Sequence, residues 1–179
     1  MIFGDPTVFA IECEIELESE GWFYGKTAIW IGKRRIGAYT TEIVPMIAER
    51  IYKAATGLNT EQMYPFSTMN AQTIMADVQS IYANPSNYAN PSNRDDVDKA
   101  LKCQEVYRYL IVFAYDIGFE NDVLIHHKLL DKIRFIWKHE DADIIHEQRI
   151  PITIYKNAIH AYLTWIKQMT GYSHDLALI

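Results

Sequence analysis

Residues 8–18 read VFAIECEIELE, and their pattern establishes the architecture of the N-terminal part of the chain. Apolar residues occupy every second position: Phe9, Ile11, Cys13, Ile15 and Leu17. Ala10 and a series of glutamates fill the positions between them. Strict period-two alternation predicts a β-strand with one buried face and one solvated face. Because glutamate is a poor strand former, packing of the apolar face has to hold this strand in place.

Two further strands are expected directly after this one. Glu20 and Gly21 mark a turn, and residues 22–31, WFYGKTAIWI, are rich in the aromatic and β-branched residues that favour strands. A charged turn at residues 32–35 precedes a short strand at residues 36–40. The first forty residues therefore predict an antiparallel meander.

The hydrophobic period changes after this meander. Three-and-four spacing and end signals predict helices at residues 41–57, 68–82, 95–116 and 151–171. Thr41 is expected to cap the first helix, and Pro45 falls in its first turn, where a missing N–H costs little. The third helix is apolar on nearly every side in its second half, so it is expected at the centre of the core.

A second group of strands interrupts these helices. Residues 123–129 and 132–137 predict a hairpin around Leu130 and Asp131, and residues 144–149 predict a further strand. The order of strands, helices, strands and helix favours an α+β fold. We expect a single domain over residues 1–179, in which an antiparallel sheet packs against about four helices.

Length and composition limit the classes of function. The 179 residues are 49% hydrophobic and 22% charged, which are ordinary values for one globular domain. The formal net charge of −6 disfavours direct nucleic-acid binding, because phosphate contacts need a positive surface, but it permits a basic partner. The start of the chain has no signal-peptide pattern and residues 109–115 are the longest apolar run, so a cytoplasmic protein without membrane contact is expected.

Catalytic motifs are absent from the sequence. It contains no glycine-rich phosphate loop, no GxSxG and no HExxH. The six histidines, among them His126, His127, His139 and His146, are the best candidates for catalytic residues. Their spacing matches no metal-ligand frame, and no general-base partner is evident. We therefore expect a protein that is not an enzyme and that has no metal or cofactor.

The hexapeptide YANPSN occurs twice in succession, at residues 82–87 and 88–93. Its two Asn-Pro steps predict turns. The simpler interpretation is a local duplication in a loop that tolerates length. The alternative is a loop that contacts a partner through Tyr88 and its neighbours, because Tyr and Asn suit adaptable contacts.

The acidic residues form three sets. The first is the row of glutamates on the strand that opens the fold: Glu12, Glu14, Glu16, Glu18 and Glu20. The second is the group at the start of the third helix: Asp95, Asp96 and Asp98. The third follows the predicted hairpin: Glu140, Asp141, Asp143 and Glu147.

Each acidic set has a structural and a functional interpretation. The first row can form cross-strand ion pairs with Lys26, Arg34 and Arg35, or it can attract a basic partner. The helix-start aspartates can serve as caps. The third set has the least basic charge nearby in the sequence and is therefore the preferred candidate for partner binding.

The four tryptophans are candidates for core or interface positions. Large aromatic residues at regular spacing usually belong to the core, which is the expectation for Trp30, Trp137 and Trp165. Trp22 adjoins the glycine of a predicted turn and is expected to be exposed.

Several segments resemble a family of bacterial immunity proteins. They are MIFGDP at residues 1–6, FAI at 9–11, GK at 25–26, IWIG at 29–32, IG at 36–37 and FIW at 135–137. These hydrophobic and glycine motifs are similar to those of the immunity protein 42 family of polymorphic toxin systems. They are signatures of a fold, not of a chemistry.

The resemblance implies a cytoplasmic protein of a toxin-carrying bacterium. Such a protein binds the C-terminal toxin domain of a contact-dependent inhibition or related system and has no catalysis of its own. Many of these toxins are basic nucleases, which an acidic protein would complement. The resemblance thus implies an immunity protein that occludes a toxin, with ribonuclease favoured over deoxyribonuclease, in a 1:1 heterodimer.

The binding surface is expected to centre on Glu140, Asp141, Asp143 and Glu147. Asp95, Asp96, Asp98 and Tyr88 come second, and the glutamates of the first strand come third. Two alternatives remain open from the residues: a small histidine-dependent hydrolase or nuclease, and a regulatory binding module without a toxin partner.

Overall fold

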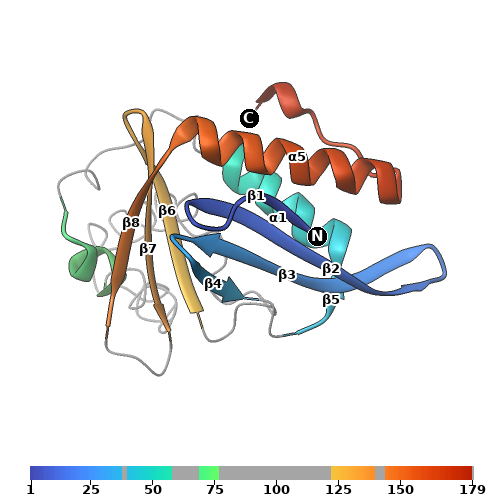
Figure 1. Cartoon of the computed structure of the whole chain (residues 1–179), viewed down its shortest axis with the longest axis horizontal. Coiled ribbons are helices and arrows are strands. Elements are labelled where there is room, and N and C mark those ends of the chain that lie inside the picture. The colour runs from blue at the N-terminus through green and yellow to red at the C-terminus, as the bar shows by residue number, and fades with distance from the viewer. Residues whose placement is uncertain (38–39, 58–68, 77–121, 140–143, 179) are drawn as a thin grey trace, which may run out of the picture.

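The computed structural model describes residues 1–37, 40–57, 69–76, 122–139 and 144–178. These residues form two antiparallel sheets and two long helices. Figure 1 shows the N-terminal sheet on one side of the molecule and the second sheet on the other. The expected α+β class is confirmed.

The first sheet is the predicted meander with additions at its edges. Its strands are β1 (Ile2–Asp5), β2 (Phe9–Ser19), β3 (Trp22–Ile31), β4 (Arg34–Gly37) and β5 (Glu42–Ile43). The order is β1-β2-β3-β4, and β5 pairs with β3. Glu20 and Gly21 both have positive φ, 53° and 80°, as two-residue hairpin turns require. The short strands β1 and β5 were not predicted.

The second sheet contains the predicted hairpin and the strand after it. Its strands are β6 (Asp122–Leu129), β7 (Lys132–His139) and β8 (His146–Pro151), with β7 in the middle. The turn lies at Leu130 and Asp131 as expected, and Leu130 has a φ of 56°. The alternation of side chains along β7 and β8 places Ile133 and Ile150 opposite each other, and both are buried.

The long helices are α1 (Val44–Gly57) and α5 (Ile152–Thr170), and residues 71–76 form a short helical segment. Pro45 lies in the first turn of α1 as predicted, whereas Thr41 does not cap that helix. Its hydroxyl donates to Glu16 instead, because β5 separates it from the helix start. The described part of the chain thus holds three α-helical segments instead of four; the helix expected at residues 95–116 lies outside it.

The end of α5 follows the sequence prediction closely. Gly171 adopts a φ of 72°, and its N–H donates to the carbonyl of Lys167, a usual way to end a helix. A 3₁₀ turn, η1 (Leu176–Leu178), follows. Among the helices described, none is long and apolar enough to cross a membrane.

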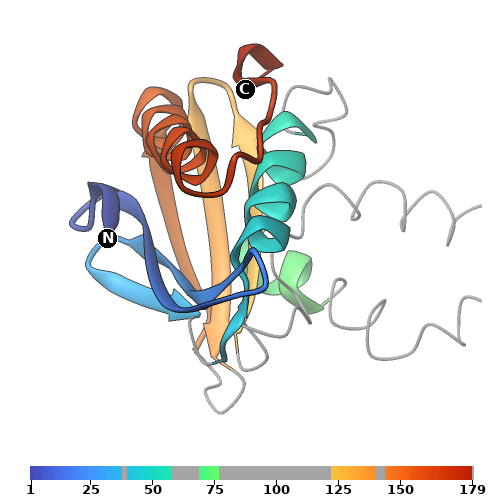
Figure 2. The same cartoon turned by 90° about the vertical axis from the view of Figure 1, so that its right-hand side faces the viewer.

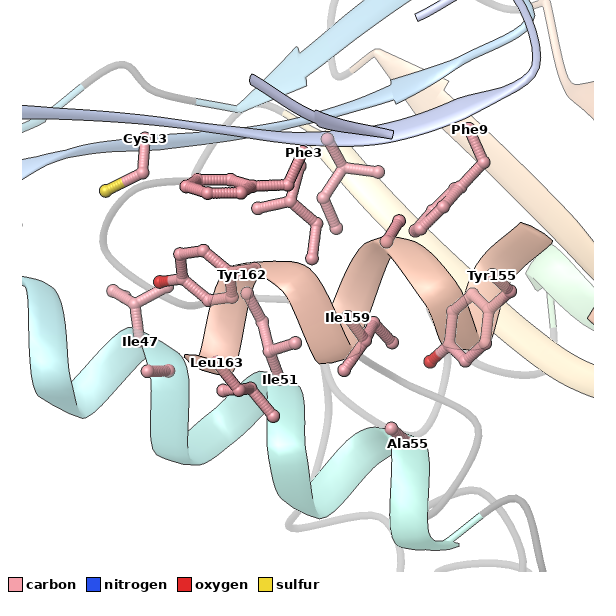
Figure 3. Close-up of a cluster of buried hydrophobic side chains, with 14 of the residues drawn as sticks. Phe3, Phe9, Cys13, Ile47, Ile51, Ala55, Tyr155, Ile159, Tyr162 and Leu163 are labelled. Carbon is pink, nitrogen blue, oxygen red and sulfur yellow. The ribbon is translucent and has the colours of Figure 1, made fainter. Parts of the chain in front are cut away.

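The main core lies between the first sheet and the two long helices. Figure 2 shows α1 and α5 next to each other, with the strands of the second sheet behind them. In Figure 3, Phe3, Phe9 and Cys13 point from the sheet toward Ile159 and Tyr162 of α5. Phe9 and Ile11 have exposed fractions of 1% and 0%, which confirms the apolar face predicted for the start of β2.

A β-bulge at Glu16 reverses this alternation in the second half of β2. Ile15 pairs with Gly25 and Leu17 pairs with Tyr24, so Glu16 has no residue opposite it. Adjacent residues of β3 face opposite sides, so Leu17 lies on the face away from Ile15. The expected burial of Leu17 is therefore wrong, and 56% of this residue is exposed.

Candidate functional site

The outer face of the first sheet carries a compact group of polar contacts around Glu12. Its carboxylate accepts hydrogen bonds from Trp30 Nε1 at 2.7 Å and from Arg35 Nη2 at 2.8 Å. The Arg35 guanidinium is the main cause that holds the pKa of Glu12 below its ordinary value. Trp30 was expected in the core, but the register pairs it with Arg35 on the outer face, where it is half-buried.

A second ion pair on this face involves Glu16. Lys26 Nζ lies 2.7 Å from its Oε1, and the Lys26 contact is the main cause that lowers the pKa of Glu16. The structural interpretation of the glutamate row is thus confirmed at Glu12 and Glu16. Arg34 does not join these ion pairs; its Nη1 donates to His146 Nε2 at 2.9 Å.

Glu18 and Glu20, near the tip of the β2–β3 hairpin, differ from the ion-paired Glu12 and Glu16. The bulge places Glu18 opposite Phe23, so it leaves the row that Glu12 and Glu14 share. Glu18 and Glu20 are exposed, and neither carboxylate has a hydrogen bond or ion pair within residues 1–37 or the other described segments. These two carboxylates are therefore available to a partner.

Glu147 is the member of the preferred acidic set that the structure describes, and two arginines hold it. Arg134, whose side chain is 3% exposed, donates from Nε and Nη2 to its two oxygens at 3.0 and 2.8 Å. Arg149 Nη2 lies 3.3 Å from Oε1. Arg134 is the first cause that lowers the pKa of Glu147. The expectation of little basic charge nearby is wrong for Glu147, because strand pairing brings Arg134 beside it.

Most of the other residues predicted for partner binding lie outside the described residues. They are Tyr88, Asp95, Asp96, Asp98, Glu140, Asp141 and Asp143, and both YANPSN copies lie outside as well. The same holds for the side chains of His126, His127 and His139. In the segments that the structure describes, no group of three or more metal-ligating side chains could hold an ion.

A groove opens between the tip of the β2–β3 hairpin, the first turns of α1 and the segment after α5. Its volume is about 460 Å³. Trp22, Met46 and Tyr172 line it and are 51%, 50% and 45% exposed. Trp22 is thus exposed as predicted, and the end of the hairpin reaches past α1 on the side away from the second sheet (Figure 1).

The charged residues in this groove already have partners. Glu49 contacts Lys53 Nζ and His174 Nε2, each at 3.1 Å, and Arg50 Nη1 lies 3.5 Å from a Glu42 oxygen. The His174 side chain is 2% exposed and lies between the rings of Tyr52 and Tyr172. The charged side chains that line the groove are therefore held by contacts within the protein, and their positive and negative charges nearly cancel.

The sequence gives little sign of this groove. Glu49 and His174 are far apart along the chain, and the spacing within each segment indicates only a helix and a helix end. The exposed Trp22 beside Gly21 is the one local signal, because a large aromatic residue at a turn is seldom needed for packing.

Most of the sequence matches the model of a known protein family. The family model described as immunity protein 42 matches residues 1–165. The chain belongs to this family. It is therefore an immunity protein that neutralises a cognate toxin and not an enzyme, as the N-terminal motifs predicted.

Comparison with solved structures agrees on the fold. The crystal structure of CdiI from Burkholderia dolosa AUO158 matches 92% of this chain and 99% of its own, with a TM-score of 0.65 and 13% sequence identity. At this identity the likeness concerns the fold alone. No curated protein sequence matches the chain.

Proposed function

We propose that this immunity protein neutralises a toxin domain with a basic substrate-binding site by covering that site in a 1:1 complex. The observation that supports this proposal is acidic charge without internal compensation on a member of an immunity family. The net charge is −6, and Glu18 and Glu20 have no partner in the described segments. A nuclease fits this chemistry, because it has to hold a phosphate backbone with lysines and arginines, and we favour a ribonuclease.

Carboxylates are proposed to guide the toxin into place and to occupy its phosphate sites. Glu140, Asp141 and Asp143 lie in the connection between β7 and β8, and we propose them as the main contacts. Asp95, Asp96, Asp98 and Tyr88 are proposed as a second group. Glu147 would act differently, because Arg134 and Arg149 already neutralise its charge.

Opposite charges on the two partners predict fast association that depends on salt. Electrostatic steering raises association rates well above the usual 10⁵–10⁶ M⁻¹s⁻¹, and added salt screens the effect. The complex should therefore form more slowly at about 0.5 M salt than at about 0.05 M, while its dissociation rate changes less.

Co-expression tests the function itself. The C-terminal domain of the toxin encoded beside this protein should arrest growth when it is expressed alone, and this chain should restore growth. Persistent arrest despite good expression of the folded chain would contradict the proposed function. Inhibition of RNA or DNA cleavage by one molar equivalent would then establish both the target and the stoichiometry.

Charge reversal tests the proposed contacts. The triple variant Glu140→Lys, Asp141→Lys, Asp143→Lys should bind the toxin more weakly and associate more slowly at low salt. Asp131→Lys, a reversal in the exposed turn between β6 and β7, is the control for the single variant Asp141→Lys, because the two variants have the same net charge. Association kinetics of the triple variant that equal those of the wild type would remove this acidic stretch from the interface.

A further inference from the structure

The groove beside the hairpin tip exposes large apolar side chains from three separate segments. Trp22 comes from the start of β3, Met46 from α1 and Tyr172 from the chain after α5. Each residue is close to half exposed. Scattered exposed hydrophobic residues are common on soluble proteins, but several around one concave surface mark a contact site.

Core packing does not explain the position of Trp22. Its neighbour Phe23 packs against the main core, whereas Trp22 lies outside the core cluster. It stands beside a turn in which both Glu20 and Gly21 have positive φ, so the tight hairpin holds its backbone in a defined place. A tryptophan held in this way is the usual anchor of a protein interface, because burying it on binding needs little additional ordering.

The charges around the groove indicate what kind of partner fits. The lining residues Glu49 and Lys53 form an ion pair, and Arg50 pairs with Glu42, so they add little net charge. Glu18 and Glu20 lie in the same hairpin tip as Trp22, outside the lining of the groove itself, and their exposed carboxylates have no ion pair in the described segments. An apolar groove with unpaired carboxylates nearby can bind an apolar side chain of a partner protein when lysine or arginine residues flank that side chain.

We infer that this groove is a docking site for the toxin, and that it takes an aromatic or aliphatic side chain of the toxin flanked by basic residues. This inference rests on the proposed function and adds a second contact surface to the one proposed at Glu140, Asp141 and Asp143. A second copy of the chain fits the groove less well, since a copy with a net charge of −6 would bring like charge against Glu18 and Glu20.

The inference predicts a hot spot at Trp22. Trp22→Ser should weaken binding of the purified toxin domain by about 30-fold or more, measured by calorimetry or biolayer interferometry. Leu17→Ser is the matched control, because Leu17 is on the same hairpin and equally exposed but does not line the groove. Leu17→Ser should bind within about threefold of the wild type.

Two further variants test the opposite wall and the charge. Met46→Ser on α1 should also weaken binding, and this loss would show that the groove, not the hairpin fold, is responsible. Glu18→Lys combined with Glu20→Lys should lower the association rate at low salt and leave the melting temperature unchanged. Circular dichroism and thermal melting of every variant separate lost contact from lost folding.

The outcomes distinguish this inference from the proposed function. Wild-type protein that binds the toxin while Trp22→Ser and Met46→Ser bind equally well would overturn the docking site and leave the proposed function intact. Wild-type protein that fails to bind or inhibit the toxin would overturn both. A wild-type dimer that Trp22→Ser converts to a monomer would assign the groove to self-association and overturn the toxin as its occupant.

Discussion

The base and the tip of the β2–β3 hairpin are continuous strands with opposite surroundings. At the base, Ile11 is fully buried and Glu12 is held by Trp30 and Arg35. At the tip, Leu17 is 56% exposed and Glu18 has no ion pair among the described residues. The bulge at Glu16 marks the boundary between these two halves.

This contrast separates residues that stabilise the fold from residues that can bind. Side chains at the base gain free energy from burial and from charge pairing within the protein. The exposed side chains at the tip, such as Leu17 and Glu18, have gained little of either, so they can gain both on association with a partner. A short bulge is sufficient to divide one hairpin in this way, because it changes which face each later residue occupies.

The largest expected effect comes from truncating a residue at the base. Ile11→Ala should lower the free energy of unfolding by about 3 kcal/mol, because it removes a buried side chain and leaves a cavity in the core. Leu17→Ala at the tip should change the free energy of unfolding by no more than about 0.5 kcal/mol. Urea denaturation of both variants measures the difference. Equal destabilisation would show that the tip packs on the core as firmly as the base does.

The contrast between ion-paired and unpaired carboxylates also applies to the second sheet. Glu147→Gln removes the charge that pairs with Arg134, whose side chain is 3% exposed. Removing one partner of a buried charge costs about 3–5 kcal/mol, and we expect about 2 kcal/mol here because Glu147 is itself partly exposed and Arg134 keeps other contacts. The matched change Glu18→Gln should have almost no effect on the free energy of unfolding. A small effect of Glu147→Gln would show that the other contacts of Arg134, among them the one to the Met69 carbonyl, are sufficient to stabilise its charge.

Local patterns predicted most of the strands and helices of the described residues. Alternation predicted the start of β2, turn residues predicted the hairpin between β6 and β7, and Gly171 predicted the end of α5. These signals depend only on neighbours along the chain, so they can be recognised in the sequence. The bulge at Glu16 was missed, since an alternating sequence continues through it without interruption. Thr41 was assigned to a helix cap for a related reason: nothing local shows that β5 comes before the helix.

The candidate site was harder to predict, because it depends on contacts between distant segments. The sequence indicated that Trp22 is exposed, but not that Met46 and Tyr172 lie beside it. It indicated that acidic residues cluster, but not which of them are neutralised. Arg134 is thirteen residues from Glu147, and only the pairing of β7 with β8 brings them together.

The smallest expected effect is a pH dependence at the base of the hairpin. The hydrogen bonds from Arg35 hold the pKa of Glu12 below its ordinary value of 4.5, so the folded state binds this proton less readily than the unfolded state. The stabilisation is therefore complete above the unfolded pKa and is lost as the pH falls through the lower pKa of the folded state. At neutral pH, Glu12→Gln should lower the free energy of unfolding by about 0.5–1 kcal/mol, the range for a partly exposed ion pair. This difference from the wild type should shrink as the pH falls below 4.5 in a series of urea titrations. Glu18→Gln is the control at the tip, and its free energy of unfolding should equal that of the wild type. If the difference between Glu12→Gln and the wild type stays constant with pH, packing and not charge makes Glu12 stabilising.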